Sequence, residues 1–339
     1  MTYDVKQLLE HVQADAIEAL DNGAVHQWSQ NEIDALHLAL ACERPLLVRG
    51  EPGTGKTQLA LAAAAALKWH LQRVTISPRF EAQDLFHSFD AVQRLADAQA
   101  AGAGGGGVKP DKTYCLPGPF WRAFDWDGAG RYGPHAARLS PDEKHDGADY
   151  AGHVILIDEI DKADSDLPNS LLEVLGSREF PNPVTQEAIR PKDGLLPLVV
   201  ITTNEERELP AAFLRRCVVL TLEPDKSYVD FLVKRGRAHF GTAAVPADRL
   251  EDEILKIAAE QLDGDRNNAK AAGVPPPGLA EYIDLLTALR RLAPGDPEKQ
   301  RDWLGRLARY AFLKNGVVEG NPKLSQNPPT ATKPDSSAG

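Results

Sequence analysis

The stretch Leu46–Thr57, which reads LLVRGEPGTGKT, decides the fold expected for this chain. A short apolar run ends in glycine, the spacing G-x-x-x-x-G-K-T follows, and a helix-forming run from Gln58 to Leu67 comes next. Glycines let a backbone turn so tightly that its N–H groups point inward at phosphate oxygens, and the helix N-terminus behind them adds partial positive charge. An ordinary turn between a strand and a helix rarely combines these fixed positions with this context. The stretch therefore predicts a phosphate-binding loop.

Each residue type in this loop has a chemical reason. Lys56 is expected to reach the outer phosphates of a nucleotide, and the Thr57 hydroxyl is expected to ligate Mg²⁺. The residues predicted to bind the nucleotide are Gly50, Glu51, Pro52, Gly53, Thr54, Gly55, Lys56, Thr57 and Gln58.

A second motif completes the predicted site. An apolar run, His153–Ile157, is typical of a strand buried on both faces of a parallel sheet, and Asp158 and Glu159 follow it directly. Asp158 is expected to hold Mg²⁺ together with Thr57, and Glu159 to polarise an attacking water. Two solvated loop acids are the alternative, but the phosphate loop upstream favours the catalytic interpretation.

Three further residues are candidates for the chemistry. Asn204 ends the next apolar run, where its amide could orient the water or touch the γ-phosphate; a turn-forming Asn is the alternative. Arg215 and Arg216 follow, and planar guanidinium groups suit phosphate oxygens. They are too far along the chain to reach the same nucleotide easily, so one of them is expected to act across a subunit boundary as an arginine finger. A solvated surface pair is the alternative.

Composition limits the class of protein. The 339 residues are 42% hydrophobic and 26% charged, with 49 acidic against 38 basic side chains and a net charge of -11. This acidity argues against direct nucleic-acid binding, which needs a basic face. No apolar run approaches the roughly 18 residues that a membrane span needs. The cysteines, Cys42, Cys115 and Cys217, show no C-x-x-C spacing, so we expect free thiols in a soluble cytoplasmic protein.

The order of the patterns predicts an α/β fold: a doubly wound parallel sheet of the P-loop NTPase type, followed by a small all-α domain. We expect an N-terminal helical extension over residues 1–26, with a helix at Val5–Leu20, and a nucleotide-binding domain over residues 27–224. Four helical patterns predict a helical domain over residues 225–318: Tyr228–Phe240, Leu250–Leu262, Leu279–Leu292 and Glu298–Leu313. The segment 82–101 is also expected to be helical. The glycine-rich tract 101–107 is predicted to be a mobile loop tip, and the polar tail 319–339 to be disordered.

Taken together, these motifs resemble those of the AAA+ ATPases, specifically the MoxR branch and its helix-2-insert relatives. Residues 50–57 are similar to the Walker A loop of that family, residues 156–162 to its Walker B strand, Thr203-Asn204 to its first sensor and residues 209–217 to its arginine-finger segment. Residues 84–90 and 118–123 are similar to the segments around the helix-2 insert of the MoxR branch.

The resemblance implies Mg²⁺-dependent ATP hydrolysis at the subunit boundaries of a ring, usually a hexamer, with the helical domain acting as a lid. It further implies a chaperone-like role in remodelling or maturing a protein, often with a partner that carries a von Willebrand factor A domain. One departure stands out, because the start of the expected lid helix, Pro276–Glu281, lacks the arginine of the family's second sensor; Arg290 and Arg291 lie further along.

Two other classes use the same phosphate loop. An NTPase subunit of a nucleic-acid-acting or defence complex, possibly GTP-dependent, is the alternative that the sequence leaves open. A small-molecule kinase is disfavoured, because such enzymes rarely need an Asp-Glu pair after a buried strand together with a distant arginine pair.

Overall fold

A computed structural model describes residues 8–20, 25–77, 80–102, 108–134, 151–164, 166–223, 227–241 and 249–312. The chain forms two compact units, residues 1–224 and 225–339. The loop tip predicted over 101–107 is wrong for residues 101 and 102, which end a helix (Ala91–Gly102), while residues 103–107 and the predicted disordered tail lie outside the described residues.

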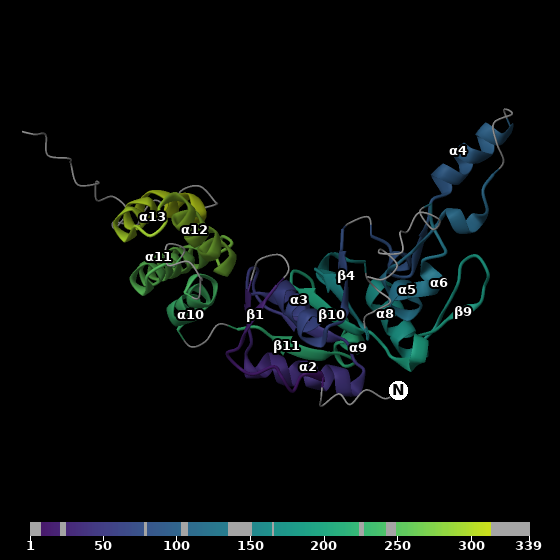
Figure 1. Ribbon diagram of the computed structural model, residues 1–339, viewed down its shortest axis with the longest axis horizontal. Helices are drawn as coiled ribbons and strands as arrows, with labels where there is room; N and C mark the ends of the chain where they lie inside the picture. Colours follow the sequence, from purple (N-terminus) through teal and green to yellow (C-terminus); the bar gives the residue numbers. More distant parts are fainter. Residues whose placement is uncertain are drawn as a thin grey trace, which may run out of the picture. The chain divides into compact units, whose positions relative to one another are not determined.

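A parallel five-stranded sheet forms the centre of the first unit, with the order β11-β3-β10-β7-β4 (Figure 1). Its strands are β3 (Leu46–Arg49), β4 (His70–Thr75), β7 (His153–Asp158), β10 (Leu198–Thr203) and β11 (Val218–Thr221). The predicted doubly wound parallel sheet is confirmed. Because β10 lies between β3 and β7 and runs parallel to both, the carboxyl ends of the three strands lie side by side at one edge of the sheet.

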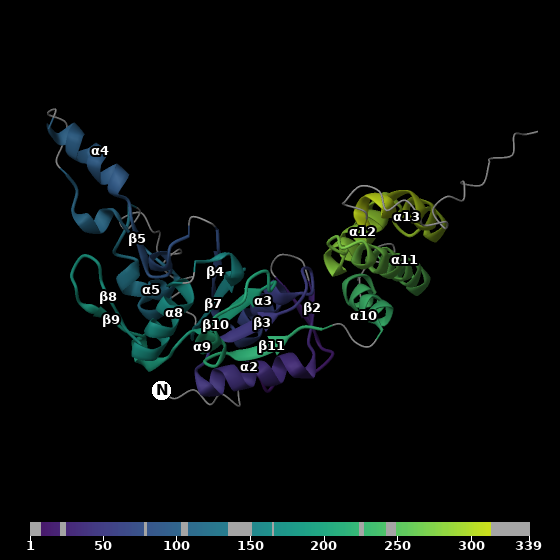
Figure 2. The same cartoon turned by 180° about the vertical axis from the view of Figure 1, so that it is seen from behind.

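Helices cover both faces of this sheet (Figure 2). On one face α2 (Gln30–Cys42) and α3 (Lys56–Leu67) pack against strand residues such as Leu46 and Val48. On the other face α5 (Pro119–Phe124), α8 (Asp166–Ser177) and α9 (Ala211–Leu214) pack against alternate residues such as Leu47. Successive side chains of a strand point to opposite faces, so strands covered on both sides are mostly apolar.

The N-terminal helix expected over Val5–Leu20 is wrong in its second half. Ile17–Ala19 forms a strand, β1, that pairs antiparallel with β2 (Val25–Gln27). Asp15 has a left-handed backbone with φ of 64°, and its N–H donates to the Trp28 carbonyl at 2.8 Å, so the chain leaves any helical path there. Cross-strand pairing, which periodicity does not reveal, overrides the helical spacing.

The helix expected over 82–101 is also wrong in its first half. A 3₁₀ turn (Ala82–Leu85) and a strand, β5 (His87–Phe89), precede α4 (Ala91–Gly102), and β5 pairs with β6 (Cys115–Pro117). The Asp90 carboxylate accepts the N–H of Gln93 at 2.8 Å and so starts α4 after the strand. In Figures 1 and 2, α4 stands away from the sheet beyond this hairpin. A second short hairpin is formed by β8 (Phe180–Pro181) and β9 (Ala188–Ile189), which pair antiparallel.

The described part of the second unit, residues 227–241 and 249–312, forms four helices: α10 (Tyr228–Phe240), α11 (Asp252–Ala271), α12 (Leu279–Leu292) and α13 (Pro297–Phe312). The four helical patterns are therefore confirmed, with shifts at the ends of α11 and α13. Their apolar faces meet in one core. Buried Arg266 donates to the Pro277 carbonyl at 3.0 Å and lies 4.4 Å from the Tyr228 ring, which fixes the proline-rich connector. Within the described residues of both units, every helix is too short or too polar to cross a membrane.

Candidate functional site

The predicted phosphate loop lies between β3 and α3, and two of its glycines are required by geometry. Gly50 has a φ of 150°, and a Cβ built there would lie 2.8 Å from the Leu222 carbonyl oxygen. Gly55 has a φ of 98° and caps the start of α3. Side chains larger than hydrogen are strained in these conformations, so the loop's shape depends on glycine.

Lys56, the first residue of α3, is almost fully buried and curls back over the loop. Its ammonium donates to the carbonyls of Gly50 and Glu51 at 2.7 and 2.9 Å. Burial lowers its pKa, and the nearby carboxylates, Asp158 first among them, oppose that shift. A partly desolvated cation held inside an anion-binding loop is well placed to contact phosphate.

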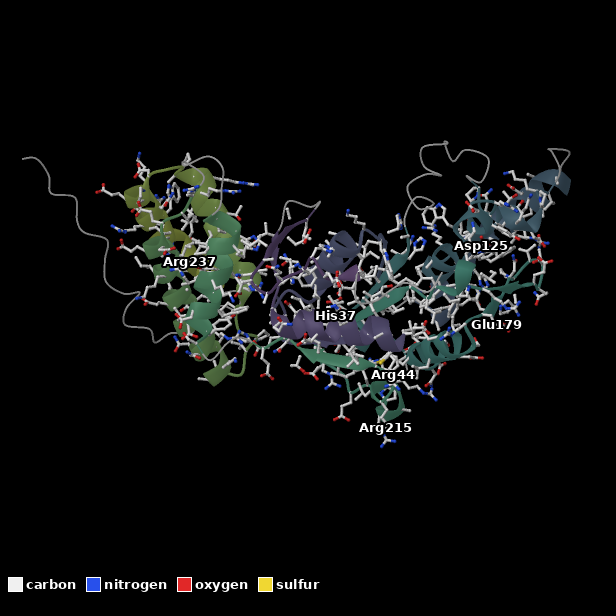
Figure 3. The ribbon with its side chains drawn as sticks, turned by 60° about the horizontal axis from the view of Figure 1, so that its bottom comes forward. His37, Arg44, Asp125, Glu179, Arg215 and Arg237 are labelled. Atoms are coloured by element: carbon white, nitrogen blue, oxygen red, sulfur yellow. The ribbon has the colours of Figure 1, made fainter. Side chains whose placement is uncertain are left out.

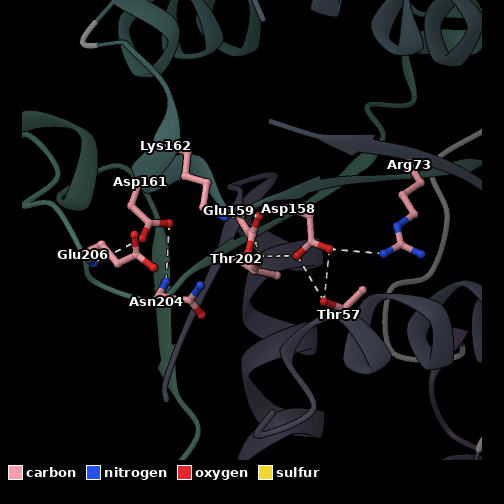
Figure 4. A network of polar contacts seen from close by, with 9 residues as sticks. All are labelled: Thr57, Arg73, Asp158, Glu159, Asp161, Lys162, Thr202, Asn204 and Glu206. Atoms are coloured by element: carbon pink, nitrogen blue, oxygen red, sulfur yellow. Dashed lines mark hydrogen bonds and ion pairs between the residues drawn. The ribbon is translucent and has the colours of Figure 1, made fainter. Parts of the chain in front are cut away.

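Thr57 and Asp158 lie in contact, although 101 positions separate them in the sequence (Figure 4). The Thr57 hydroxyl donates to the two carboxylate oxygens at 3.1 and 3.2 Å. Hydroxyl and carboxylate oxygens are the donors that Mg²⁺ prefers, and Mg²⁺ usually takes only one or two protein ligands beside substrate phosphates. The described part of the chain contains no cluster of three or more His, Cys, Asp or Glu suited to a metal. The pair thus fits a nucleotide-bound Mg²⁺.

Two residues that the sequence did not single out hold Asp158 in place. The hydroxyl of Thr202, in β10, donates to Asp158 Oδ1 at 2.5 Å and accepts the Glu159 N–H at 3.0 Å. Arg73, in β4, lies 3.4 Å from Asp158 Oδ2. For Thr202, the available signal was a pair of threonines, Thr202 and Thr203, at the end of an otherwise apolar strand. The contact of Arg73 could be found only from the strand register, which pairs Thr75 of β4 with Asp158.

Glu159 follows directly, at the end of β7, with a left-handed backbone of φ 64°. This uncommon conformation for a side chain larger than glycine turns the chain sharply after the strand. Its carboxylate accepts a hydrogen bond from Lys162 at 2.7 Å, and this bond is the main cause that raises the pKa of Lys162. Both side chains are partly exposed, so the pair can open.

Asn204 begins the loop after β10 and lies next to Asp161 of the loop after β7 (Figure 4). The three strand ends thus bring together the phosphate loop, the Asp158–Glu159 pair and Asn204 on one edge of the sheet. This edge is where open α/β sheets bind ligands.

Arg215 and Arg216 are not brought to this edge. They follow α9 and directly precede β11, whose register pairs Val218 with Leu46 at the start of β3. The phosphate loop follows the other end of β3, and a strand of this length spans about 13 Å. Both arginines are exposed, and Arg215 projects from the surface (Figure 3).

A parallel sheet with a phosphate loop, an aspartate contacting the loop's threonine and a covering layer of helices on each face defines a P-loop nucleoside-triphosphatase fold. The chain belongs to the AAA domain family, dynein-related subfamily, whose family model matches residues 45–217. Nucleotide binding and hydrolysis are general properties of this family.

Solved structures with a similar fold share little sequence with this chain. They include Thermotoga maritima RuvB, described as a Holliday junction branch migration motor, with 17% identity over 83% of this chain and 70% of that one and a TM-score of 0.43. A mutant of the same protein has 16% identity over 86% and 74% and a TM-score of 0.46. NtrX from Brucella abortus has 15% identity over 86% and 52% and a TM-score of 0.37. A search of the curated proteins found no match.

Proposed function

We propose that this protein is a MoxR-like AAA+ ATPase that hydrolyses ATP with Mg²⁺ at the subunit interfaces of a ring and uses the energy to remodel or mature a protein partner. The hydrogen bond between Thr57 and Asp158 carries the proposal, because it joins the two predicted metal-binding oxygens from separate motifs. The cytoplasm is the proposed location.

Each residue of the site has a separate role in hydrolysis. The loop from Gly50 to Gln58 cradles the phosphates, and Lys56 exchanges its carbonyl partners for phosphate oxygens when nucleotide binds. Thr57 and Asp158 hold Mg²⁺, which neutralises phosphate charge when bound. Glu159 accepts a proton from the attacking water once its hydrogen bond with Lys162 has opened. The amide of Asn204 orients that water or the γ-phosphate.

The positions of Arg215 and Arg216 support a site that two subunits share. Both precede β11 at the edge of the sheet opposite the phosphate loop, so neither reaches the nucleotide bound by its own chain. Both are exposed and therefore available to a neighbouring subunit. A guanidinium supplied in this way stabilises the charge of the transition state. We infer a ring, with six subunits as the expected number.

The MoxR assignment rests on the motifs and on the segment between β4 and α5. Residues 84–90 and 118–123, which resemble that branch, flank α4, and the Gly118 N–H donates to the Phe86 carbonyl at 2.7 Å. A remodelled protein and a partner with a von Willebrand factor A domain follow from the resemblance alone. The helical unit is the proposed lid, with no second-sensor arginine at Pro276–Glu281.

ATP and GTP turnover, measured across protein concentration, tests this function. We expect ATP turnover per chain to rise with concentration, to fall more than tenfold in Glu159→Gln and to collapse in Arg215→Ala or Arg216→Ala. Mixing the inactive arginine variant with Lys56→Ala should restore activity, because a mixed interface then combines an intact loop with an intact finger.

Arg190→Ala is the matched control, because Arg190 is an exposed arginine that pairs with Glu179 on the β8–β9 hairpin. Its turnover should equal that of the wild type. Turnover that is independent of concentration and of both arginines would refute the shared site. A preference for GTP, with stimulation by nucleic acid at low salt, would instead support a subunit of a nucleic-acid-acting complex.

A further inference from the structure

Asp161 is a buried carboxylate that the reaction described above does not use. It lies in the 3₁₀ turn after β7 (Ile160–Lys162) and is 2% exposed. Its Oδ1 accepts the backbone N–H of Asn204 at 3.4 Å, and its Oδ2 accepts the backbone N–H of Glu206 at 3.2 Å (Figure 4). One side chain thus ties the loop after β7 to the loop after β10.

The loop that Asp161 holds has little regular structure of its own. Glu205 lies between the two bonded N–H groups with a left-handed φ of 61°, and its own N–H donates to the Thr203 hydroxyl at 2.9 Å. Arg207 adds a long contact, 3.5 Å, to the Ala163 carbonyl. Because a buried carboxylate needs hydrogen-bond donors, and these N–H groups need an acceptor, the loop has one favoured position relative to β7.

Two lysines place positive charge near the Asp161 carboxylate. The charges of Lys56 and Lys162 both interact with Asp161, one from the phosphate loop and the other from its own turn. A negative charge that faces backbone N–H groups makes stronger hydrogen bonds than a neutral acceptor does. The neutral amide of asparagine, which has only one acceptor oxygen, cannot reproduce both bonds.

We propose that Asp161 is a positioning residue for hydrolysis: by holding the backbone of Asn204, it sets where the Asn204 amide stands relative to Glu159 and the γ-phosphate. In this role Asp161 acts on the reaction only through Asn204. This inference rests on the proposed ATPase activity and deepens it. A displacement of about 1 Å in a catalytic group can lower a rate on the order of 100-fold, so the expected effect is on kcat.

A double-mutant cycle on the full chain tests the proposal. We would measure kcat for ATP and the Kd of a fluorescent ATP analogue for Asp161→Asn, Asn204→Ala and the double variant. Asp161→Asn should lower kcat by about ten- to 100-fold and leave Kd within about twofold, because the phosphate loop is untouched. The kcat of the double variant should lie within about threefold of the kcat of Asn204→Ala, because Asp161 affects the reaction only through the Asn204 side chain.

Asp164→Asn is the matched control, since Asp164 is an exposed acid of the same loop. Its kcat should equal that of the wild type. If Asp161→Asn does not fold, the same cycle is run with Asp161→Ser, whose hydroxyl still accepts one hydrogen bond.

The outcomes separate this inference from the proposed function. Three outcomes would each overturn the role of Asp161 in an active ATPase. The rate losses of the two single variants could multiply in the double variant, or Asp161→Asn could keep the wild-type kcat. The Kd of Asp161→Asn could also rise by as large a factor as its kcat falls. A wild-type chain that hydrolyses no nucleotide would refute the proposed function, and this inference with it.

Discussion

Thr202 provides the sharpest test of how the site is built. Its side chain is 1% exposed and serves two partners, since it donates to Asp158 Oδ1 at 2.5 Å and accepts the Glu159 N–H at 3.0 Å. Thr202→Val keeps the shape and β-branching but removes both bonds. A hydrogen bond to a charged group contributes about 1.5–3 kcal/mol and a neutral one about 0.5–1.5 kcal/mol. The gain from burying one more methyl offsets part of this loss, at about 1 kcal/mol.

We therefore expect Thr202→Val to lower the free energy of unfolding by about 2–3 kcal/mol, measured by urea denaturation. Thr203→Val is the matched control, because Thr203 is equally buried in the same strand and accepts one hydrogen bond, from the Glu205 N–H. With the same offset for the added methyl, the change in its free energy of unfolding should lie within about 0.5 kcal/mol of zero. Since Asp158 and Glu159 lose a common partner, kcat for ATP should also fall at least tenfold in Thr202→Val.

Equal destabilisation by the two valine variants, or an unchanged kcat in Thr202→Val, would contradict the role assigned to Thr202. The first result would mean that the short bond to Asp158 contributes nothing beyond a neutral one. The second would mean that Asp158 and Glu159 are held without Thr202.

Three further predictions follow from the geometry. Lys162→Met should raise basal ATP turnover by up to about fivefold, because the partly exposed bond to Glu159 no longer has to open; a lower turnover would contradict this. Burial lowers the pKa of His153 to about 4, so the unfolded chain binds a proton on this imidazole more tightly than the folded chain does. The free energy of unfolding therefore decreases as the pH falls from about 6.5 to 4. His153→Phe should remove up to about 2–3 kcal/mol of that loss, seen as a flatter pH profile in thermal denaturation. Gly50→Ala should raise the Kd for ATP at least tenfold in a fluorescence titration, since its Cβ would lie 2.8 Å from the Leu222 carbonyl; wild-type binding would show that the loop can shift.

Much of the fold follows from local patterns. The Ser29 cap with Glu32 three residues on predicts the start of α2, and both bonds of that capping box are present. Apolar runs such as Val154–Ile157 predict buried strands because helices cover both faces of a parallel sheet. Two segments that were predicted to be helical, Ile17–Ala19 and His87–Phe89, are short strands of two-stranded sheets. Each forms a strand only because a partner elsewhere in the chain pairs with it.

By itself the sequence determined the phosphate loop, its lysine and threonine, the acids after the buried strand and the polar residue after the next. Each of these signals is a residue type at a fixed spacing from a strand or helix, and such spacing is local. The tertiary structure decided which strands are neighbours and in what register. It therefore decided that Thr202 bridges Asp158 and Glu159, that Arg73 reaches Asp158 and that Asp161 holds the loop of Asn204. These contacts join residues 43 to 85 positions apart, and no local pattern encodes them because they depend on the order in which the strands assemble.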